Sequence, residues 1–160
     1  SPLMYTFGAW APGHSMLFKK EVLETALPLS NWVTHDYLLG FSATCHYGIA
    51  YIPIPLVHYR QHESNAIGAD FKNAKKLYQT RAERNMRICE RIKILAERCC
   101  DSKEKQLFEQ LYLDFSGNSL FNRMRRCKTV LKYRDDMLAY KGKSSLGNFL
   151  YCFKLLFSIY

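Results

Sequence analysis

Residues 81–98 read RAERNMRICERIKILAER, and this stretch decides most of the predicted fold. Its apolar side chains recur every three or four residues, which is typical of one face of an α-helix, and Arg and Lys occupy the other face. The pattern extends upstream and comprises Ala74, Leu77, Tyr78, Ala82, Met86, Ile88, Cys89, Ile92, Leu95 and Ala96. The sequence therefore predicts helix from about residue 70 to residue 98.

The residues that follow predict further helices. Ser102, with Glu104 two residues later, suits the start of a second helix. Gly117-Asn118 interrupts or bends it before a third apolar pattern, which runs over residues 120–140 and ends at Gly142. Residues 146–160 are strongly apolar with a single Lys, so the C-terminal half is predicted to be helical throughout.

The N-terminal half mixes helical and extended patterns. Residues 3–18 predict two short extended pieces around Pro12-Gly13, and residues 19–27 predict a helix that Pro28 ends. Thr34 is a predicted N-cap of the next helix, which ends near Gly48.

Two short strands are expected after that helix, over residues 49–52 and 56–60. Pro53-Ile54-Pro55 forms a stiff link between them, because neither proline donates to a ladder. The fold prediction is therefore α+β but mostly helical: a partial α/β remnant with a few short strands, followed by a long helical tail. Its bare strand edges would favour self-association, so we expect a homo-oligomer.

Charge is distributed unevenly along the 160 residues. Residues 1–70 carry three Lys or Arg against five acids, whereas residues 71–160 carry 20 against nine. Such asymmetry indicates that the second segment faces an anionic partner, either nucleic acid, a phospholipid surface or a phosphorylated substrate.

Six cysteines occur without a CxxC pair, which disfavours zinc and redox motifs. We interpret them as reduced packing thiols of a cytoplasmic protein, and Cys99-Cys100 as a helix end. There is no basic-then-apolar leader and no run of about 20 apolar residues. Because the chain opens without Met and reads like the middle of a fold, we expect it to be a piece of a longer protein.

Three short blocks carry candidate chemistry. They are Gly13-His14-Ser15-Met16-Leu17-Phe18-Lys19-Lys20, then His35-Asp36-Tyr37, then Tyr59-Arg60-Gln61-His62-Glu63-Ser64-Asn65. Their order and spacing resemble the second half of inverting family 2 glycosyltransferases of the GT-A type, in particular rhamnosyltransferase-like enzymes. The resemblance covers residues 7 to about 69, and it includes Pro28 and the Ile52-Pro53-Ile54-Pro55-Leu56 link.

The resemblance implies two regions: residues 1–69 as the acceptor-side part of the catalytic domain, and residues 70–160 as a basic helical extension. It implies transfer of a sugar from a nucleotide-sugar donor to a glycan or lipid-linked glycan, with inversion. Asp36 would be the general base that takes the proton of the acceptor hydroxyl. An ordinary helix-capping carboxylate is the alternative interpretation of Asp36.

The other implied roles each have a structural alternative. Gly13 and His14 would lie on the acceptor side, although Pro12-Gly13 forms a turn in any protein. His35 would orient Asp36 or the acceptor, yet many relatives carry an acid there, and a surface histidine is an equal alternative. Arg60 would bind the diphosphate and His62 would contribute a metal ligand, the alternative being a polar loop.

The implied cofactor is a divalent metal, Mn²⁺ or Mg²⁺, in the complete enzyme. No Asp-x-Asp motif occurs in this sequence, so we expect the chain alone to bind no metal or donor and to be inactive.

A rival interpretation is a non-enzymatic basic helical module for an anionic membrane surface or nucleic acid. RNA-binding motifs with stacking aromatic residues are not evident, so no nucleic acid is expected. Peripheral contact with the inner face of the membrane through the basic tail fits a lipid-linked acceptor. The terminal apolar residues would lie in the membrane interface or pack on the core; these are Phe149, Leu150, Phe153, Leu155, Leu156, Phe157 and Ile159, with Lys154 among them.

Overall fold

The structure is a computed structural model, and it describes residues 1–8, 11–58, 80–142 and 144–157. Seven α-helices lie in these ranges: α1 (Lys20–Ala26), α2 (His35–His46), α3 (Arg81–Arg98), α4 (Ser102–Ser116), α5 (Leu120–Lys132), α6 (Arg134–Met137) and α7 (Ser145–Lys154). Three short 3-10 segments accompany them: η1 (Pro2–Tyr5), η2 (Gly13–Ser15) and η3 (Ala139–Lys141).

The predicted α+β class is wrong, because the described residues form helices and contain no strand. Residues 49–58, where strands were expected, are irregular, and every one of them is exposed. A strand needs a neighbour that accepts and donates its backbone hydrogen bonds, and among the described residues no backbone hydrogen bond to residues 49–58 is found. Residues 49–58 therefore have the apolar pattern of strands but do not form a sheet.

The extended pieces predicted for residues 3–18 are replaced in part by 3-10 turns over residues 2–5 and 13–15, whereas Pro12 and Met16 keep extended backbone angles. Ser1 caps η1 through a hydrogen bond from Leu3 N, with Pro2 in the first turn, and Thr6 Oγ1 donates to Leu3 O at 2.7 Å. These local hydrogen bonds favour a helical turn over an extended chain.

The predicted helices are confirmed within the described residues, with changes at their ends. The helix predicted from about residue 70 begins only at Arg81, because Thr80 has extended backbone angles and caps it by accepting from Glu83 N; residues 70–79 lie outside the described residues. α2 begins after Thr34 and ends two residues before Gly48, which has a φ of 79°. The helix predicted over residues 120–140 breaks at Tyr133, whose φ of −107° and ψ of 23° separate α5 from α6. Gly142, in the left-handed region at φ 56°, ends η3 as predicted.

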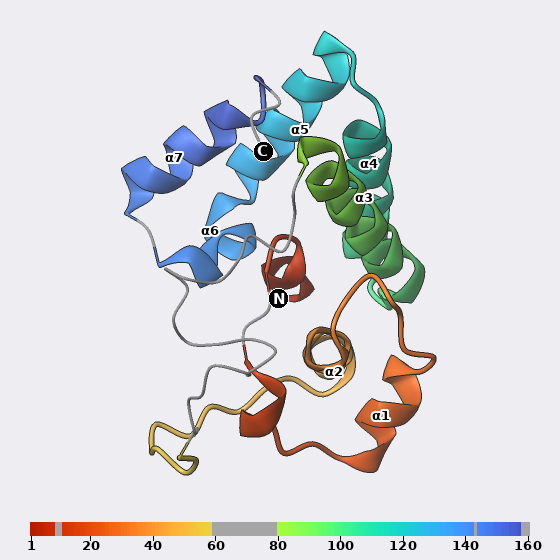
Figure 1. Cartoon of the computed structure of the whole chain (residues 1–160), viewed down its shortest axis with the longest axis vertical. Helices are drawn as coiled ribbons and strands as arrows, with labels where there is room; N and C mark the ends of the chain where they lie inside the picture. Colours follow the sequence, from red (N-terminus) through yellow and green to blue (C-terminus); the bar gives the residue numbers. More distant parts are fainter. Residues whose placement is uncertain (9–10, 59–79, 143, 158–160) are drawn as a thin grey trace.

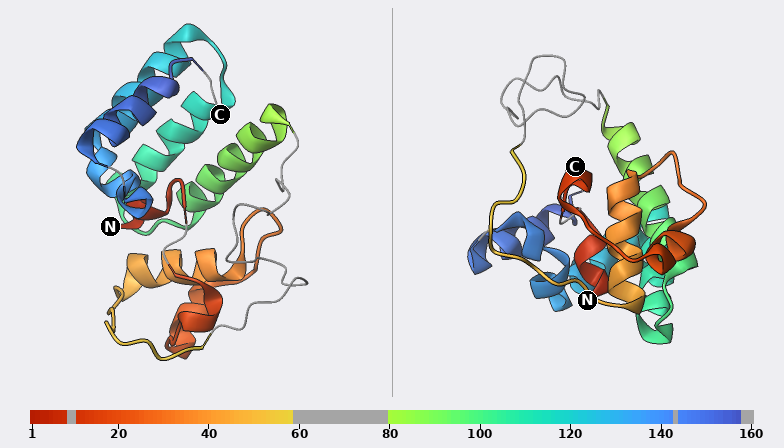
Figure 2. Two further views of the ribbon diagram at one scale, coloured as in Figure 1. Left: turned by 60° about the vertical axis from the view of Figure 1, so that its left-hand side comes forward. Right: turned by 90° about the horizontal axis from the view of Figure 1, so that it is seen from below.

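Two groups of helices share one core. Figure 1 shows α3 and α4 as an antiparallel hairpin, with α5 beside it, α7 on the far side of α5, and α1 and α2 at the other end of the molecule. In the left view of Figure 2, α1 and α2 form a separate layer, and η1 lies between that layer and α6. Aromatic rings join the groups: Phe41 of α2 packs edge-on against Tyr5 and Phe108, with ring centroids 6.1 and 6.2 Å apart.

Polar contacts also tie the N-terminal layer to the hairpin. Arg98, at the end of α3, donates hydrogen bonds to the carbonyl oxygens of Ala26 and Pro28. Ser1 Oγ donates to Glu104 of α4 at 3.1 Å. The end of α1 is thereby fixed against the α3–α4 turn.

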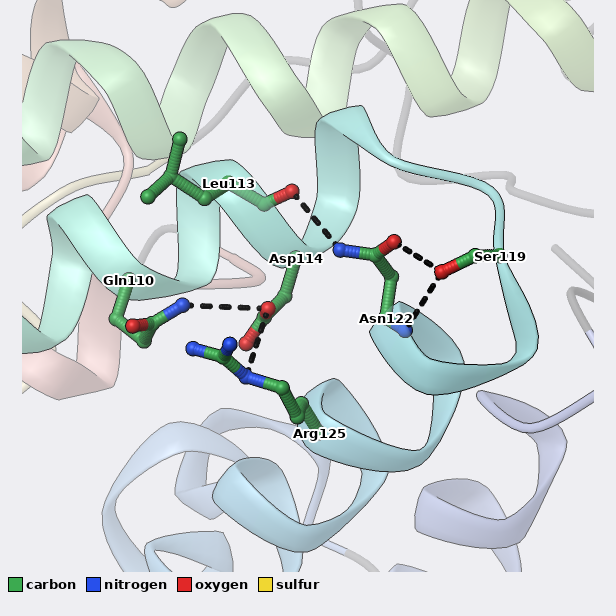
Figure 3. Close-up of polar contacts among 6 residues, drawn as sticks. All are labelled: Gln110, Leu113, Asp114, Ser119, Asn122 and Arg125. Carbon is green, nitrogen blue, oxygen red and sulfur yellow. Dashed lines mark hydrogen bonds and ion pairs between the residues drawn. The ribbon is translucent and has the colours of Figure 1, made fainter.

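The turn between α4 and α5 is held by a polar network (Figure 3). Asn122 Nδ2 donates to Leu113 O at 3.5 Å, and its backbone N donates to Ser119 Oγ at 3.1 Å. A Cβ on Gly117 would lie 2.5 Å from Asn122 Oδ1, so the close approach of this carboxamide requires glycine there.

Candidate functional site

The clearest candidate site lies where the Pro12-Gly13 turn meets the start of α2. A Cβ added to Gly13 would lie 2.8 Å from His35 Nε2 and 3.6 Å from Asp36 Cβ. Two of the three sequence blocks, 22 residues apart, are therefore in contact. Only a residue without a Cβ lets the backbone approach the His35 ring this closely.

Asp36 occupies the first turn of α2. Its Oδ1 accepts a hydrogen bond from Tyr37 N at 2.8 Å, and the side chain remains partly exposed. Thr34, the N-cap residue, makes no side-chain capping bond, so the carboxylate of Asp36 satisfies a backbone donor of this helix end. The capping interpretation is therefore met, and the exposed part of the carboxylate still faces solvent beside Gly13.

Two buried aromatic residues, Tyr5 and Tyr37, pack next to Asp36. Tyr37 donates its hydroxyl hydrogen to Tyr5 O, and the two rings meet edge-on with centroids 5.5 Å apart. The Arg91 guanidinium of α3 lies over the Tyr37 ring at 4.9 Å. These contacts fix the first turn of α2 against the core, although the sequence analysis assigned no role to Tyr5 or Arg91.

The surroundings of Tyr5 shift the pKa of its hydroxyl. Burial raises the pKa of the Tyr5 hydroxyl, the nearby Thr44 hydroxyl lowers it, and the negative charge of Asp36 raises it.

The two histidines of the site are on its surface. His14 and His35 are both exposed, and the turn that carries His14 is held by Ser15, whose N and Oγ donate to Pro12 O at 2.9 and 2.8 Å. The contact that the structure shows is thus between Gly13 and the His35-Asp36 pair, and His14 follows Gly13 in the same exposed turn.

Arg60 and His62, the diphosphate and metal candidates, lie outside the described residues, as does the rest of their block. Among the residues that the structure describes, no group of three or more His, Cys, Asp or Glu side chains is arranged to hold a metal ion. The described part of the chain thus offers no site that fits the implied Mn²⁺ or Mg²⁺.

A second cluster joins the C-terminal end of α2 to the end of α3. Cys100 Sγ lies 3.2 Å from His46 Nε2, and both side chains are exposed. Cys45 and Cys99 are hydrogen-bonding neighbours beside them, and burial raises the pKa of the Cys45 thiol to about 12. The helix end predicted at Cys99-Cys100 is confirmed, but the proximity of His46 was not visible in the sequence.

The arginines of the basic segment do not form one solvated face. Arg84 is exposed, but Arg87 and Arg91 are half-buried. Arg126 is only 4% exposed; its Nε donates to Leu155 O at 3.2 Å, and its guanidinium lies 5.3 Å from the centroid of the Phe115 ring. Part of the positive charge therefore serves the packing of α3, α5 and α7.

No helix in the described ranges is both long enough and apolar enough to cross a membrane. Comparison with known proteins gives no matching family model, no matching curated protein and no matching solved structure.

Proposed function

We propose that this chain is the acceptor-side part of an inverting glycosyltransferase that resembles family 2. It would act in the cytoplasm, with a nucleotide-sugar as donor and a glycan or lipid-linked glycan as acceptor. The donor half of the catalytic domain would be supplied by residues outside these 160.

The observation that carries the proposal is the contact of Gly13 with His35 and Asp36. The resemblance places these three residues on one acceptor surface, and the 2.8 Å approach of a Gly13 Cβ to His35 Nε2 supports that placement. The Pro12-Gly13 turn and the start of α2 are far apart in the sequence, so the fold itself brings them together. Because Gly13 has no Cβ, this close approach is sterically allowed.

Asp36 has the surroundings of a general base. Its Oδ1 accepts from Tyr37 N at 2.8 Å, which fixes the carboxylate, and its partial exposure leaves it reachable by an acceptor hydroxyl. In the proposed reaction the acceptor oxygen attacks the anomeric carbon while its proton passes to Asp36. The bond from the anomeric carbon to the nucleotide diphosphate breaks, and that leaving group carries away the electron pair.

The exposed apolar side chains of the first 58 residues support a missing neighbour. Tyr51 is 86% exposed, Leu56 is 70% exposed, and the rest of residues 49–58 are exposed as well. A protein surface seldom presents so many apolar side chains in sequence unless another element covers them. A donor half packed against residues 49–58 would supply this cover.

The experiment compares the 160-residue chain with the protein of the complete reading frame. Calorimetry with UDP-, GDP- and dTDP-sugars and Mn²⁺ should give no heat with the short chain. The complete protein should bind one donor and transfer its sugar to an acceptor in a membrane extract. Micromolar donor binding by the 160 residues alone, or a reading frame without a nucleotide-binding segment upstream of Ser1, would contradict the proposal.

A further inference from the structure

We propose that α7 and the outward face of α5 form a docking surface for an anionic phospholipid bilayer. This inference goes beyond the transfer reaction, and it stands on residues that the acceptor site does not use. The surface consists of an apolar stripe on α7 and a cationic border on α5, and is called the lipid-facing surface below.

The apolar stripe of α7 points away from the protein. Its members are Leu146, Phe149, Leu150 and Phe153, continued by Phe157 after the helix end, and each is at least 41% exposed. At 100° per residue the four helical members fall within an arc of about 100°. Cys152, about 110° around the helix from the centre of the stripe, is fully buried, so the helix packs on the bundle through another face.

The stripe differs from ordinary scattered surface hydrophobics. The rings of Phe149 and Phe153 are in tilted contact, with centroids 4.8 Å apart, which joins successive turns into one continuous apolar area. A short helix with such a face and few charges suits the boundary between lipid headgroups and acyl chains, where the apolar side chains enter and the backbone stays hydrogen-bonded. Figure 1 shows α7 at the margin of the molecule, where a flat surface can reach it.

Cations border this apolar stripe. Lys154 is exposed at the end of α7, and the outward side of α5 presents Lys128 and Lys132 together with the exposed Phe121 and Met124. α5 and α7 are packing neighbours. Mixed aromatic and lysine side chains of this kind favour the headgroup region of a membrane, because long lysine stems extend toward phosphate.

The charge of this region matches an anionic surface. Residues 115–160 contain nine Lys or Arg and two acids, Asp135 and Asp136, and neither α5 nor α7 contains an acid. Each Lys or Arg close to an anionic membrane contributes roughly 1 kcal/mol of attraction. Charge and apolar exposure therefore coincide on the same pair of helices.

A shallow hollow of about 470 Å³ lies between the two parts of the surface. It is lined by Leu131, Arg134, Ser145, Leu146 and Phe149. Arg134 donates to Leu131 O at 3.2 Å and lies 3.6 Å from the exposed Asp135, so its guanidinium is held at this place. A fixed guanidinium above apolar side chains is chemically suited to a lipid phosphate with its acyl chain below.

Two other occupants fit less well. A second copy bound through the same face would bring acid-free, cationic helices together, and like charges oppose such a symmetric contact. Nucleic acid would place its phosphates on the cations but would leave the aliphatic side chains Leu146 and Leu150 facing water. A bilayer satisfies both the cations and the apolar stripe.

The test is co-sedimentation of the 160-residue chain with vesicles. One set contains phosphatidylcholine alone, and the other contains phosphatidylcholine with phosphatidylglycerol. We expect binding to the anionic set that weakens with added salt, and at least tenfold weaker binding to the neutral set. A Leu150→Trp variant should show a blue-shifted emission change with the anionic vesicles and quenching by brominated acyl chains.

Matched variants separate the apolar stripe from simple charge attraction. Leu150→Ser should weaken binding about tenfold, because an apolar side chain no longer enters the bilayer. Leu113→Ser is its control, since Leu113 is similarly exposed (60%) but lies on α4 away from the surface, and it should bind like the parent chain. Lys128→Gln should weaken binding about fivefold, and Lys103→Gln on α4 should leave it unchanged. Circular dichroism should show the same helix content in all variants.

Three outcomes would overturn the proposal. The first is equal binding of the Leu150→Ser and Leu113→Ser variants, which would mean that charge alone drives adsorption. The second is that single-stranded RNA binds as tightly as anionic vesicles do, and that Leu150→Ser weakens neither the RNA binding nor the vesicle binding. The third is a dimer that Leu150→Ser dissociates while vesicle binding stays unchanged, because a second copy would then be the occupant. Failure of sugar transfer by the complete protein would contradict the proposed function and leave these vesicle results standing.

Discussion

The carboxylate of Asp114 and the guanidinium of Arg125 lie 3.2 Å apart and join α4 to α5 beneath the turn shown in Figure 3. Asp114 is 1% exposed, and Gln110 Nε2 donates to the same oxygen at 3.2 Å. Burial raises the pKa of the Asp114 carboxyl, and the nearby Arg125 charge and Gln110 hydrogen bond offset that effect only in part. A charged group is thus kept in the core by a partner that still reaches solvent.

Removing that partner should destabilise the protein. Arg125→Met leaves a buried carboxylate without its counter-charge, and we expect the free energy of unfolding to fall by about 1–3 kcal/mol. Arg84→Met, at an exposed position of α3, should change it by less than about 0.5 kcal/mol. The double variant Asp114→Asn/Arg125→Met should recover part of the loss. Urea denaturation measures all three, and equal stabilities for the Arg125 and Arg84 variants would contradict the role of the pair.

Asp114 should also give a defined pH dependence. Its folded-state pKa lies above the value of 3.8 for an unfolded chain, so the folded protein binds this proton more tightly. The stability from this group is therefore fully present below 3.8 and is lost as the pH rises through the folded pKa. Asp114→Asn should accordingly cost more stability below pH 3.8 than at neutral pH, as measured by urea denaturation at both. The opposite order would show that the Arg125 charge lowers the pKa of Asp114 by more than burial raises it.

Two glycines should respond differently to alanine. In Gly13→Ala the new methyl group meets the end of an exposed ring, His35 Nε2, which can rotate away, so stability should fall by less than about 1 kcal/mol. In Gly40→Ala the methyl group would lie 2.3 Å from the hydroxyl oxygen of Tyr5 inside the core, and the loss should be about 1–3 kcal/mol or more. Thermal unfolding should rank the two variants in this order. The His35 ring signals should shift in the NMR spectrum of Gly13→Ala, and in a His35→Ala background the Gly13→Ala change should cost less stability than it does alone.

The cysteines should react with iodoacetamide in an order set by exposure and pKa. Cys100 is exposed beside His46 and should be alkylated first. Burial raises the pKa of Cys45 to about 12 and that of Cys152 to about 11, so both thiols stay protonated and should react slowly at neutral pH. Peptide mass spectrometry over time gives the order, with Cys100→Ser as the control that removes the fast site. Early labelling of Cys152 would mean that α7 does not pack as described.

The helices were predictable because their signal is local. The apolar period around residues 81–98 depends only on neighbouring residues and appears in the structure. The helix expected to start at Ser102 also forms, but Asp101 rather than Ser102 is its N-cap. Strands depend on a second segment to pair with, so the pattern in residues 49–58 was a sound strand signal without an available neighbour. The break at Tyr133 was missed because it reflects how α5 and α6 pack on different neighbours.

The candidate site was predictable in part for the same reason. Gly13, His35 and Asp36 were identified from short blocks, and the structure brings them into contact. The supporting residues Tyr5 and Arg91 come from distant segments and carry no local motif. The burial of Asp114 and Arg126 was likewise invisible, since charged residues in a helix are usually solvated and only the packed neighbours show otherwise.

The last prediction tests the proposed base in the complete protein. Tyr37 N donates to Asp36 Oδ1 at 2.8 Å. The amide of Asp36→Asn has nearly the same size and can still accept this hydrogen bond, so the fold should be retained. An amide cannot take the proton of the acceptor hydroxyl at neutral pH, so transfer should fall by about 10² to 10⁴. Donor binding should be nearly unchanged, because Asp36 lies on the acceptor side in the proposed reaction. Asp101→Asn is the matched control: Asp101 Oδ1 caps α4 by accepting from Lys103 N and Glu104 N at 2.9 Å, and it has no place in the chemistry. If Asp36 serves only the helix end, both variants will keep most of their activity. Turnover of the Asp36 variant within tenfold of the parent protein, at normal thermal stability, removes it from the mechanism.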